Sequence, residues 1–116
     1  MSITPTSPRC FIVLENALEL IAMLHEPLKG IRAADTDLAK QIRRAATSIA
    51  LNLGEGQRRR GKDRIHHYRI AAGSADEVRV ALRISVMWRY IKEEDVAAML
   101  DQIDGINAML YRITER

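Results

Sequence analysis

Apolar residues recur at intervals of three and four along most of this chain, and this spacing places them on one face of an α-helix. Breakers are few, with 3 prolines and 6 glycines in 116 residues, so long helices are favoured. The pattern predicts four helices, at about residues 7–26, 36–55, 62–90 and 93–115. Long helices with short links are typical of an all-α, antiparallel up-down four-helix bundle, here a single domain spanning residues 1–116.

Capping residues indicate several of the helix ends. Ser7, which is followed by a proline, is typical of a helix start, and Pro27 predicts the end of the first helix. Asp35 or Thr36 caps the second helix. Gly56 is a natural left-handed residue just past the end of that helix.

Each helix carries an apolar row that predicts its buried face. In the first helix this row is Phe11, Leu14, Leu18, Ile21, His25 and Leu28. We expect His25 to be a packed, hydrogen-bonded core residue. The second helix has the row Leu38, Ile42, Ala45, Ile49, Asn52 and Leu53, and the fourth has Val96, Met99, Ile103, Ile106, Leu110 and Ile113. Aromatic residues are only 4% of the chain, so the predicted core is aliphatic.

The third helix carries two rows instead of one. The first consists of Tyr68, Ala71, Ala75, Val78 and Leu82, and the second of Ile70, Ser74, Glu77, Ala81, Ile84, Trp88 and Ile91. Together they exceed the ~100° stripe that one helix needs to face one core. We therefore predict that copies of the chain pack against each other, with an interface made by Ile70, Ala81, Ile84, Trp88 and Ile91.

The remaining composition bears on the compartment. Cys10 is the only cysteine, so no intrachain disulfide forms, which fits a reducing environment. The N-terminus has no basic region followed by an uninterrupted apolar run, and no stretch is long and apolar enough to span a membrane. The sequence therefore predicts a cytoplasmic protein that makes no membrane contact.

Positive charge is concentrated in one part of the chain. The net charge is only +3, but residues 40–69 hold nine lysines and arginines against two acids. Arginine binds phosphate through a planar fork of donors, and the start of a helix adds free backbone N–H groups. The predicted nucleic-acid-binding residues are Arg43, Arg44, Arg58, Arg59, Arg60, Lys62, Arg64 and Arg69. With no base-reading motif, any selectivity would come from the shape of structured RNA or DNA.

Other functions remain open on the same residues. The basic turn is also compatible with a solvated loop, or with an oligomeric scaffold whose turn meets an acidic protein partner. The Gly-Lys pair at residues 61–62 is followed by neither Ser nor Thr at the required place and is preceded by no strand, so it is not a nucleotide-hydrolysis motif. No nucleophile or metal-ligand set is evident. We expect a non-enzymatic protein without a cofactor.

Several polar residues interrupt the apolar rows. The simplest interpretation is a network that fixes helix register, formed by Asn52, Glu55, Gly56, Ser74 and Glu77. An acid–base pair is the alternative. Asp63 and His67 share a helix face and lie near His66, but two or three such residues make a weak metal site without further ligands, and we predict none.

Two stretches resemble a known family. They are "IRRAATSIALNLGEGQRR" at residues 42–59 and "YRIAAGSADEV" at residues 68–78. Both are similar to the four-helix-bundle proteins encoded in intervening sequences of bacterial 23S ribosomal RNA genes. Arg64 and His67 stand where two large aromatic residues are usual, which predicts a more exposed and more basic start of the third helix.

The resemblance has its own implications. It implies an all-α bundle that assembles into a cyclic homo-oligomer, typically a pentamer, in the cytoplasm. The chain is also similar, more remotely, to the accessory variability proteins of retroelements, which bind nucleic acid and a reverse transcriptase. From this we expect an accessory to an RNA-processing or reverse-transcribing partner.

Overall fold

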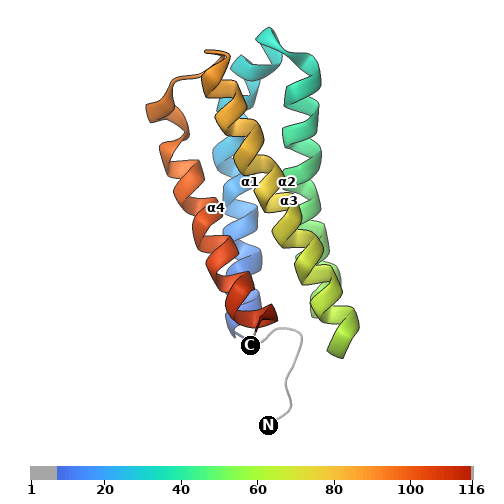
Figure 1. Cartoon of the computed structure of the whole chain (residues 1–116). Helices are drawn as coiled ribbons and strands as arrows, with labels where there is room; N and C mark the ends of the chain where they lie inside the picture. The colour runs from blue at the N-terminus through green and yellow to red at the C-terminus, as the bar shows by residue number, and fades with distance from the viewer. Residues whose placement is uncertain (1–7, 116) are drawn as a thin grey trace.

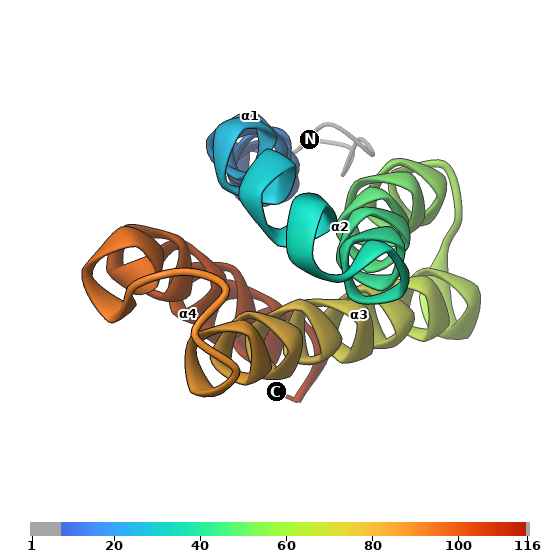
Figure 2. The same cartoon turned by 90° about the horizontal axis from the view of Figure 1, so that it is seen from above.

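The computed structural model describes residues 8–115, which form four helices and no strands (Figure 1). The helices are α1 (Pro8–Ala34), α2 (Thr36–Gln57), α3 (Gly61–Met87) and α4 (Glu93–Thr114). Consecutive helices run in opposite directions, and the bundle measures 50 × 22 × 21 Å. Seen end-on, α2 packs against α1 and α3, and α4 lies diagonally across from α2 and packs against the same two helices (Figure 2).

The first helix is longer than predicted because Pro27 does not end it. Pro27 lies inside α1, which continues to Ala34. A proline in a helix interior removes one backbone hydrogen bond and costs about 3 kcal/mol. Ile31, one turn further on, is completely buried, and burying such a side chain contributes about 1.5–3 kcal/mol. Packing beyond the proline thus offsets much of its cost. The predicted cap Ser7 lies outside the described residues.

The buried row of α1 is only partly the predicted one, since Leu14, Ile21 and Leu28 are half-buried against the core. The core face consists of Val13, Ala17, Leu20, Leu24 and Ile31. Phe11 and Leu18 are 52% and 46% exposed, and His25 is exposed beside Glu26 rather than packed in the core. Apolar residues surround much of this helix, so spacing alone did not distinguish its inner row from its outer one.

The other helices bury the rows that their spacing predicted. Tyr68, Ala71, Ala75, Val78 and Leu82 of α3 are fully buried. They meet a row of α4 that comprises Val96, Met99, Ile103, Ile106 and Leu110. Ile42, Ala45, Ile49 and Leu53 complete the core from α2, while Leu38 is only half-buried.

Helix α3 ends at Met87, three residues before the predicted end at residue 90. The N–H of Tyr90 donates to the carbonyl of Ser85, and the N–H of Arg89 donates to that of Val86, both at 2.9 Å. This is the Schellman arrangement, which requires a left-handed residue after the helix. Arg89 occupies that position with φ of 65°.

The far ends of the two helix pairs are tied together by a side chain. Asp35 caps α2 by accepting from the N–H of Leu38 at 3.0 Å. The hydroxyl of Tyr90 donates to the other oxygen of Asp35 at 3.2 Å. Burial, and then this hydrogen bond, raise the pKa of Tyr90 above its ordinary value. The α1–α2 and α3–α4 connections therefore hold each other in place.

Candidate nucleic-acid interface

The α2–α3 turn lies at one end of the bundle and carries most of the predicted phosphate-binding residues. Helix α2 ends at Gln57 and α3 begins at Gly61, which adopts the left-handed conformation with φ of +57°. Arg58, Arg60 and Lys62 are exposed, and within residues 8–115 none of them forms an ion pair or a side-chain hydrogen bond. These three cations are available to an anion.

Arg59, in contrast, is held by two carboxylates. Its guanidinium lies 2.7 Å from Oε2 of Glu55 and 3.3 Å from Oδ2 of Asp63. The hydrogen bond and charge of Arg59 lower the pKa of the Glu55 carboxyl below its ordinary value. The same partners raise the pKa of Arg59. A phosphate would have to displace these carboxylates to reach Arg59.

Arg64 has a different role from the one predicted. It is half-buried, and its Nε donates to the carbonyl oxygens of Gly56 at 3.2 Å and Arg59 at 2.9 Å. The last carbonyls of a helix lack partners within the helix and favour a cation. Arg64 therefore caps the end of α2 from the start of α3. These hydrogen bonds hold the Arg64 side chain against α2. Arg64 is therefore less exposed than we predicted for a basic residue at a position where an aromatic residue is usual.

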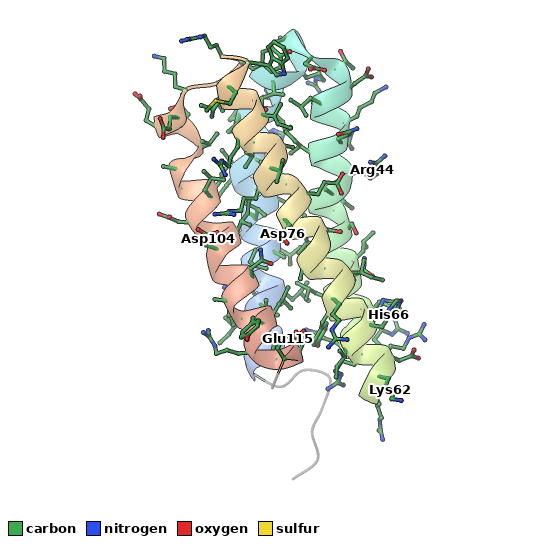
Figure 3. The ribbon with its side chains drawn as sticks, viewed as in Figure 1. Arg44, Lys62, His66, Asp76, Asp104 and Glu115 are labelled. Atoms are coloured by element: carbon green, nitrogen blue, oxygen red, sulfur yellow. The ribbon has the colours of Figure 1, made fainter. Side chains whose placement is uncertain are left out.

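The remaining predicted cations lie away from the turn. Nη2 of Arg44 lies 3.8 Å from Glu77, and Nε of Arg69 lies 3.4 Å from Glu115. Arg43 is exposed and forms no ion pair within the described residues. Arg44 precedes Arg58, the C-cap residue just after α2, by fourteen positions, which corresponds to ~21 Å at 1.5 Å per residue. Arg44 and Lys62 accordingly appear at different heights along the bundle (Figure 3).

A line of polar contacts joins α2 to α3 above the turn. The hydroxyls of Ser48 and Ser74 lie 2.9 Å apart. Nδ2 of Asn52 donates to the Ser48 carbonyl at 2.9 Å, and Oδ1 of Asn52 lies 3.0 Å from Nδ1 of His67. Together with the Arg44–Glu77 pair, these contacts fix the register of the two helices.

Sequence reasoning placed only part of this polar line. Asn52, Ser74 and Glu77 belong to it, but it also depends on Ser48 and His67, which were not included in the predicted network. Each contact joins residues about equally far before and after the turn, as an antiparallel helix hairpin requires. Pairing positions about a centre between residues 59 and 61 would have found both.

Gly56 belongs to this junction but does not end α2. It is buried inside the helix, and a Cβ added to it would lie 2.7 Å from Cδ1 of Tyr68. Tyr68 is completely buried. The prediction of a left-handed stop at Gly56 is therefore wrong. The residue is small because the tyrosine ring of α3 occupies the space that a side chain would need.

The outward face of α3 carries an apolar patch, which we call the α3 patch and define as Val80, Ile84, Met87 and Trp88. These side chains are 55%, 39%, 75% and 67% exposed, and with Arg83 they line a shallow hollow of about 330 Å³. Ile70, at 38% exposure, lies further along the helix.

Two members of the predicted interface are not on this surface. Ala81 is only 5% exposed, because its position on the helix turns it into the protomer's own core. Ile91 is half-buried and packs against the core. Neither is available to a second copy in this conformation.

Other kinds of site find no support in the described residues. Asp63 is bonded to Arg59 and His67 to Asn52, and between residues 8 and 115 no three potential metal ligands gather. None of the helices described is sufficiently long and apolar to cross a bilayer.

The fold and the turn define a class of small all-α bundles with a basic helix hairpin, and comparison with known proteins identifies the family. The model of the 23S rRNA-intervening sequence protein family matches residues 9–112. The chain belongs to this family, as the two sequence stretches suggested.

A solved structure agrees with this assignment. It is the crystal structure of a protein with unknown function from the S23 ribosomal protein family of Bacteroides thetaiotaomicron. Its identity to this chain is 25%, with a TM-score of 0.80, covering 90% of this chain and 99% of the other. No curated protein matches the sequence.

Proposed function

We propose that this protein binds the phosphate backbone of structured RNA or DNA through the α2–α3 turn, without enzymatic activity, and that it does so as a homo-oligomer. The observation that supports this best is the trio Arg58, Arg60 and Lys62. These side chains lie within five positions at an exposed end of the bundle, and none forms an ion pair among the described residues. The pKa of Glu55 is lowered mainly by the hydrogen bond and charge of Arg59, and the charge of Arg58 contributes least.

The geometry of the turn favours an anion in a second way. Arg60 occupies the position before α3, and no side chain caps the first N–H groups of that helix. Uncapped N–H groups at a helix start attract negative charge. A phosphate approaching the turn would meet three exposed cations and these donors together.

Assembly would multiply this surface. The α3 patch exposes four large apolar side chains, and such patches mark protein–protein contacts in soluble proteins. If copies pack through it, each contributes one basic turn, and the combined field attracts a polyanion more strongly than one turn does. A ring of five, a reverse-transcribing or RNA-processing partner and a cytoplasmic location stay predictions of the family resemblance.

The α3 patch also supports an alternative. A protein-binding scaffold would use the exposed apolar surface and leave the turn as a solvated loop. The two functions differ in how binding depends on salt, because each phosphate contacted contributes about −0.9 to the slope of log affinity against log salt for duplex DNA.

The test is a titration of the full-length protein against a fluorescent 16-bp DNA duplex and an RNA hairpin at several salt concentrations. Replacing Arg58, Arg60 and Lys62 with alanine should flatten the slope by up to about 2.7 per bound chain. Circular dichroism checks that the bundle is intact.

The charge-matched control replaces Arg32, Arg89 and Lys92 with alanine. These cations are exposed, form no ion pair within the described residues and lie towards the opposite end of the bundle. This control should keep the wild-type slope. Equal binding by the wild type and the turn variant would refute the nucleic-acid proposal.

A further inference from the structure

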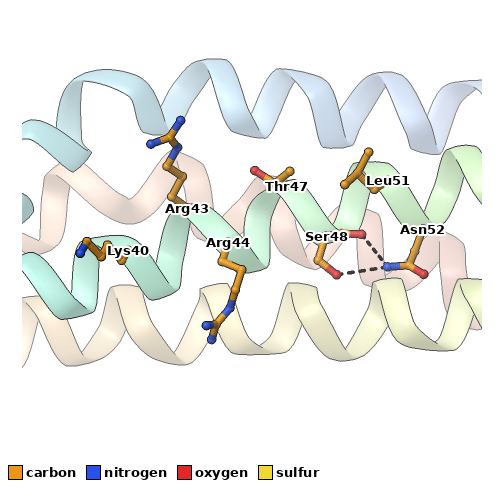
Figure 4. A pocket seen from close by; sticks show the side chains of 7 residues that line it. All are labelled: Lys40, Arg43, Arg44, Thr47, Ser48, Leu51 and Asn52. Carbon is orange, nitrogen blue, oxygen red and sulfur yellow. Dashed lines mark hydrogen bonds between the residues drawn. The ribbon is translucent and has the colours of Figure 1, made fainter.

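A cationic hollow lies not at the turn but on the outward side of α2. It has a volume of about 500 Å³ and is lined by Lys40, Arg43, Arg44, Thr47, Ser48, Leu51 and Asn52 (Figure 4). Ser48 and Asn52 are engaged in the polar line to α3. The exposed side chains of the hollow are those of Lys40, Arg43, Arg44, Thr47 and Leu51.

This part of α2 has no negative charge of its own. Between Leu38 and Gly54 the sequence contains no aspartate or glutamate. Lys40 and Arg43 form no ion pair within residues 8–115. Arg44 faces Glu77 at 3.8 Å, with both side chains largely exposed, and an exposed pair at this separation is weak. Such a surface remains cationic in solution.

The hollow and the turn lie along the same side of α2. Lys40, Arg44, Thr47, Leu51 and Arg58 follow each other at spacings of four, three, four and seven, which places them in one outward row. All five are exposed. The row extends over ~27 Å at 1.5 Å per residue. Its cations fall into two groups, with the uncharged Thr47 and Leu51 between them.

We propose that this row, which we call the α2 row, is a second phosphate-contacting surface, so that the natural ligand is an extended nucleic-acid helix lying along α2. The inference rests on the proposed function, since it extends the contact that begins at the turn. The ~21 Å between Arg44 and Arg58 corresponds to about six nucleotides at 3.4 Å per nucleotide of one strand. A mononucleotide or a single phosphate is too short to reach both groups.

The middle of the row also suits such a ligand. Leu51 is 67% exposed. Its side chain lies between the two cationic groups, where the sugar edge of a backbone that contacts both groups would pass. An acidic protein could place carboxylates in the hollow. Binding in the hollow alone would not require the cations to continue along α2 to Arg58.

The experiment compares three variants of the full-length protein on an RNA hairpin with a 10-bp stem. One replaces Lys40, Arg43 and Arg44 with alanine, one replaces Arg58, Arg60 and Lys62, and the third is the far-end control at Arg32, Arg89 and Lys92. All nine residues are exposed, and circular dichroism confirms folding. A fourth variant, Arg43→Lys with Arg44→Lys, keeps the charge and should keep the wild-type slope.

If the α2 row contacts phosphate, its alanine variant flattens the salt slope by up to about 2.7, as the turn variant does, while the far-end control does not. Loss of slope in the α2 variant alone would confine the contact to the hollow, remove the turn from the interface and overturn the extended contact along α2. Loss in the turn variant alone would overturn the α2 inference and leave the proposed function standing. Wild-type slopes in both would refute both proposals.

Two probes separate the ligand classes. Inorganic phosphate should compete with the hairpin only weakly, because a single phosphate cannot contact both cationic groups of the row at once. Polyglutamate tests the acidic-protein alternative. If the α2 variant lost binding to polyglutamate but bound the hairpin like the wild type, the row would be a protein-docking surface and the inference would be wrong.

Discussion

The ring of Tyr68 in α3 lies against the backbone of Gly56 in α2, in the space that a side chain at position 56 would fill. Tyr68 is completely buried, so its ring has little room to move away. Just beyond this contact, Arg64 caps the last carbonyls of α2. A close contact between α2 and α3 therefore lies next to the basic turn and restricts its geometry.

We expect Gly56→Ala to destabilise the bundle by about 1–3 kcal/mol, the usual cost of adding atoms to a filled core. Urea unfolding at fixed protein concentration measures the change. Gly54→Ala is the matched control, because Gly54 lies in the same helix and a Cβ there meets nothing within 4 Å. It should stabilise by about 0.5–1 kcal/mol, as alanine does in an open helix position. Equal effects of the two substitutions would show that Tyr68 does not restrict position 56.

A second stability prediction concerns the end of α3. Arg89 holds φ of 65°, a conformation that costs a non-glycine residue about 1–2 kcal/mol. Arg89→Gly should therefore stabilise the protein by about 1 kcal/mol, raising Tm by roughly 4 °C for a domain of this size. Thermal unfolding followed by circular dichroism measures it. Arg83→Gly, the same change in the helix interior, should lower Tm instead. A lower Tm for Arg89→Gly would contradict the argument.

How far the sequence predicted the fold depended on how clearly each helix separates its two faces. In α4 the row from Val96 to Leu110 is flanked by acids and small residues, so the buried face was predicted correctly. In α1 both sides are apolar, and spacing favoured Phe11 and Leu18 over Val13 and Leu20. Local rules also gave Pro27 too much weight, because they omit the packing that continues beyond it.

The candidate site shows the same division. Composition identified the basic segment correctly, since residues 40–69 contain nine lysines and arginines. Composition did not show which of these cations are bound by carboxylates or carbonyls of the protein itself. Arg59 is bound by Glu55 from one helix and Asp63 from the next, and Arg64 is used as a cap. These pairings depend on how two helices meet at a turn.

Releasing Arg59 should strengthen nucleic-acid binding. Glu55→Gln together with Asp63→Asn removes both of its carboxylate partners. If the freed guanidinium contacts one phosphate, the salt slope steepens by about 0.9. Glu93→Gln with Glu94→Gln makes the same charge change at the far end of the bundle and should leave the slope unchanged. An identical response to both pairs would indicate a general charge effect only.

The same ion pair predicts a dependence of stability on pH. Because Arg59 lowers the pKa of Glu55 in the folded protein, the pair stabilises the fold above the ordinary pKa of a glutamate. This contribution is lost as the pH falls through the lowered folded-state value. Glu55→Gln should therefore reduce Tm near neutral pH and make its fall on acidification shallower. Parallel curves for variant and wild type between pH 7 and pH 3 would contradict this.

Self-association through the α3 patch makes the last prediction. Trp88 is 67% exposed and Met87 is 75% exposed. Exposing such large apolar side chains to water side by side is unfavourable for a monomer of 13.1 kDa. Placing a charge there, as Trp88→Glu or Ile84→Asp, should shift the protein to smaller species in sedimentation velocity, because a buried unpaired carboxylate opposes association. Tyr111→Glu is the matched control, since Tyr111 is equally exposed but lies on α4.

The consequence for binding follows from the same variant. If each copy in the assembly presents a turn, Trp88→Glu should weaken affinity for long duplexes although every basic residue is retained. A short hairpin that spans one turn should bind wild type and variant alike. A wild-type protein that sediments as a monomer would exclude assembly, and unchanged size in both patch variants would place the contact between copies elsewhere.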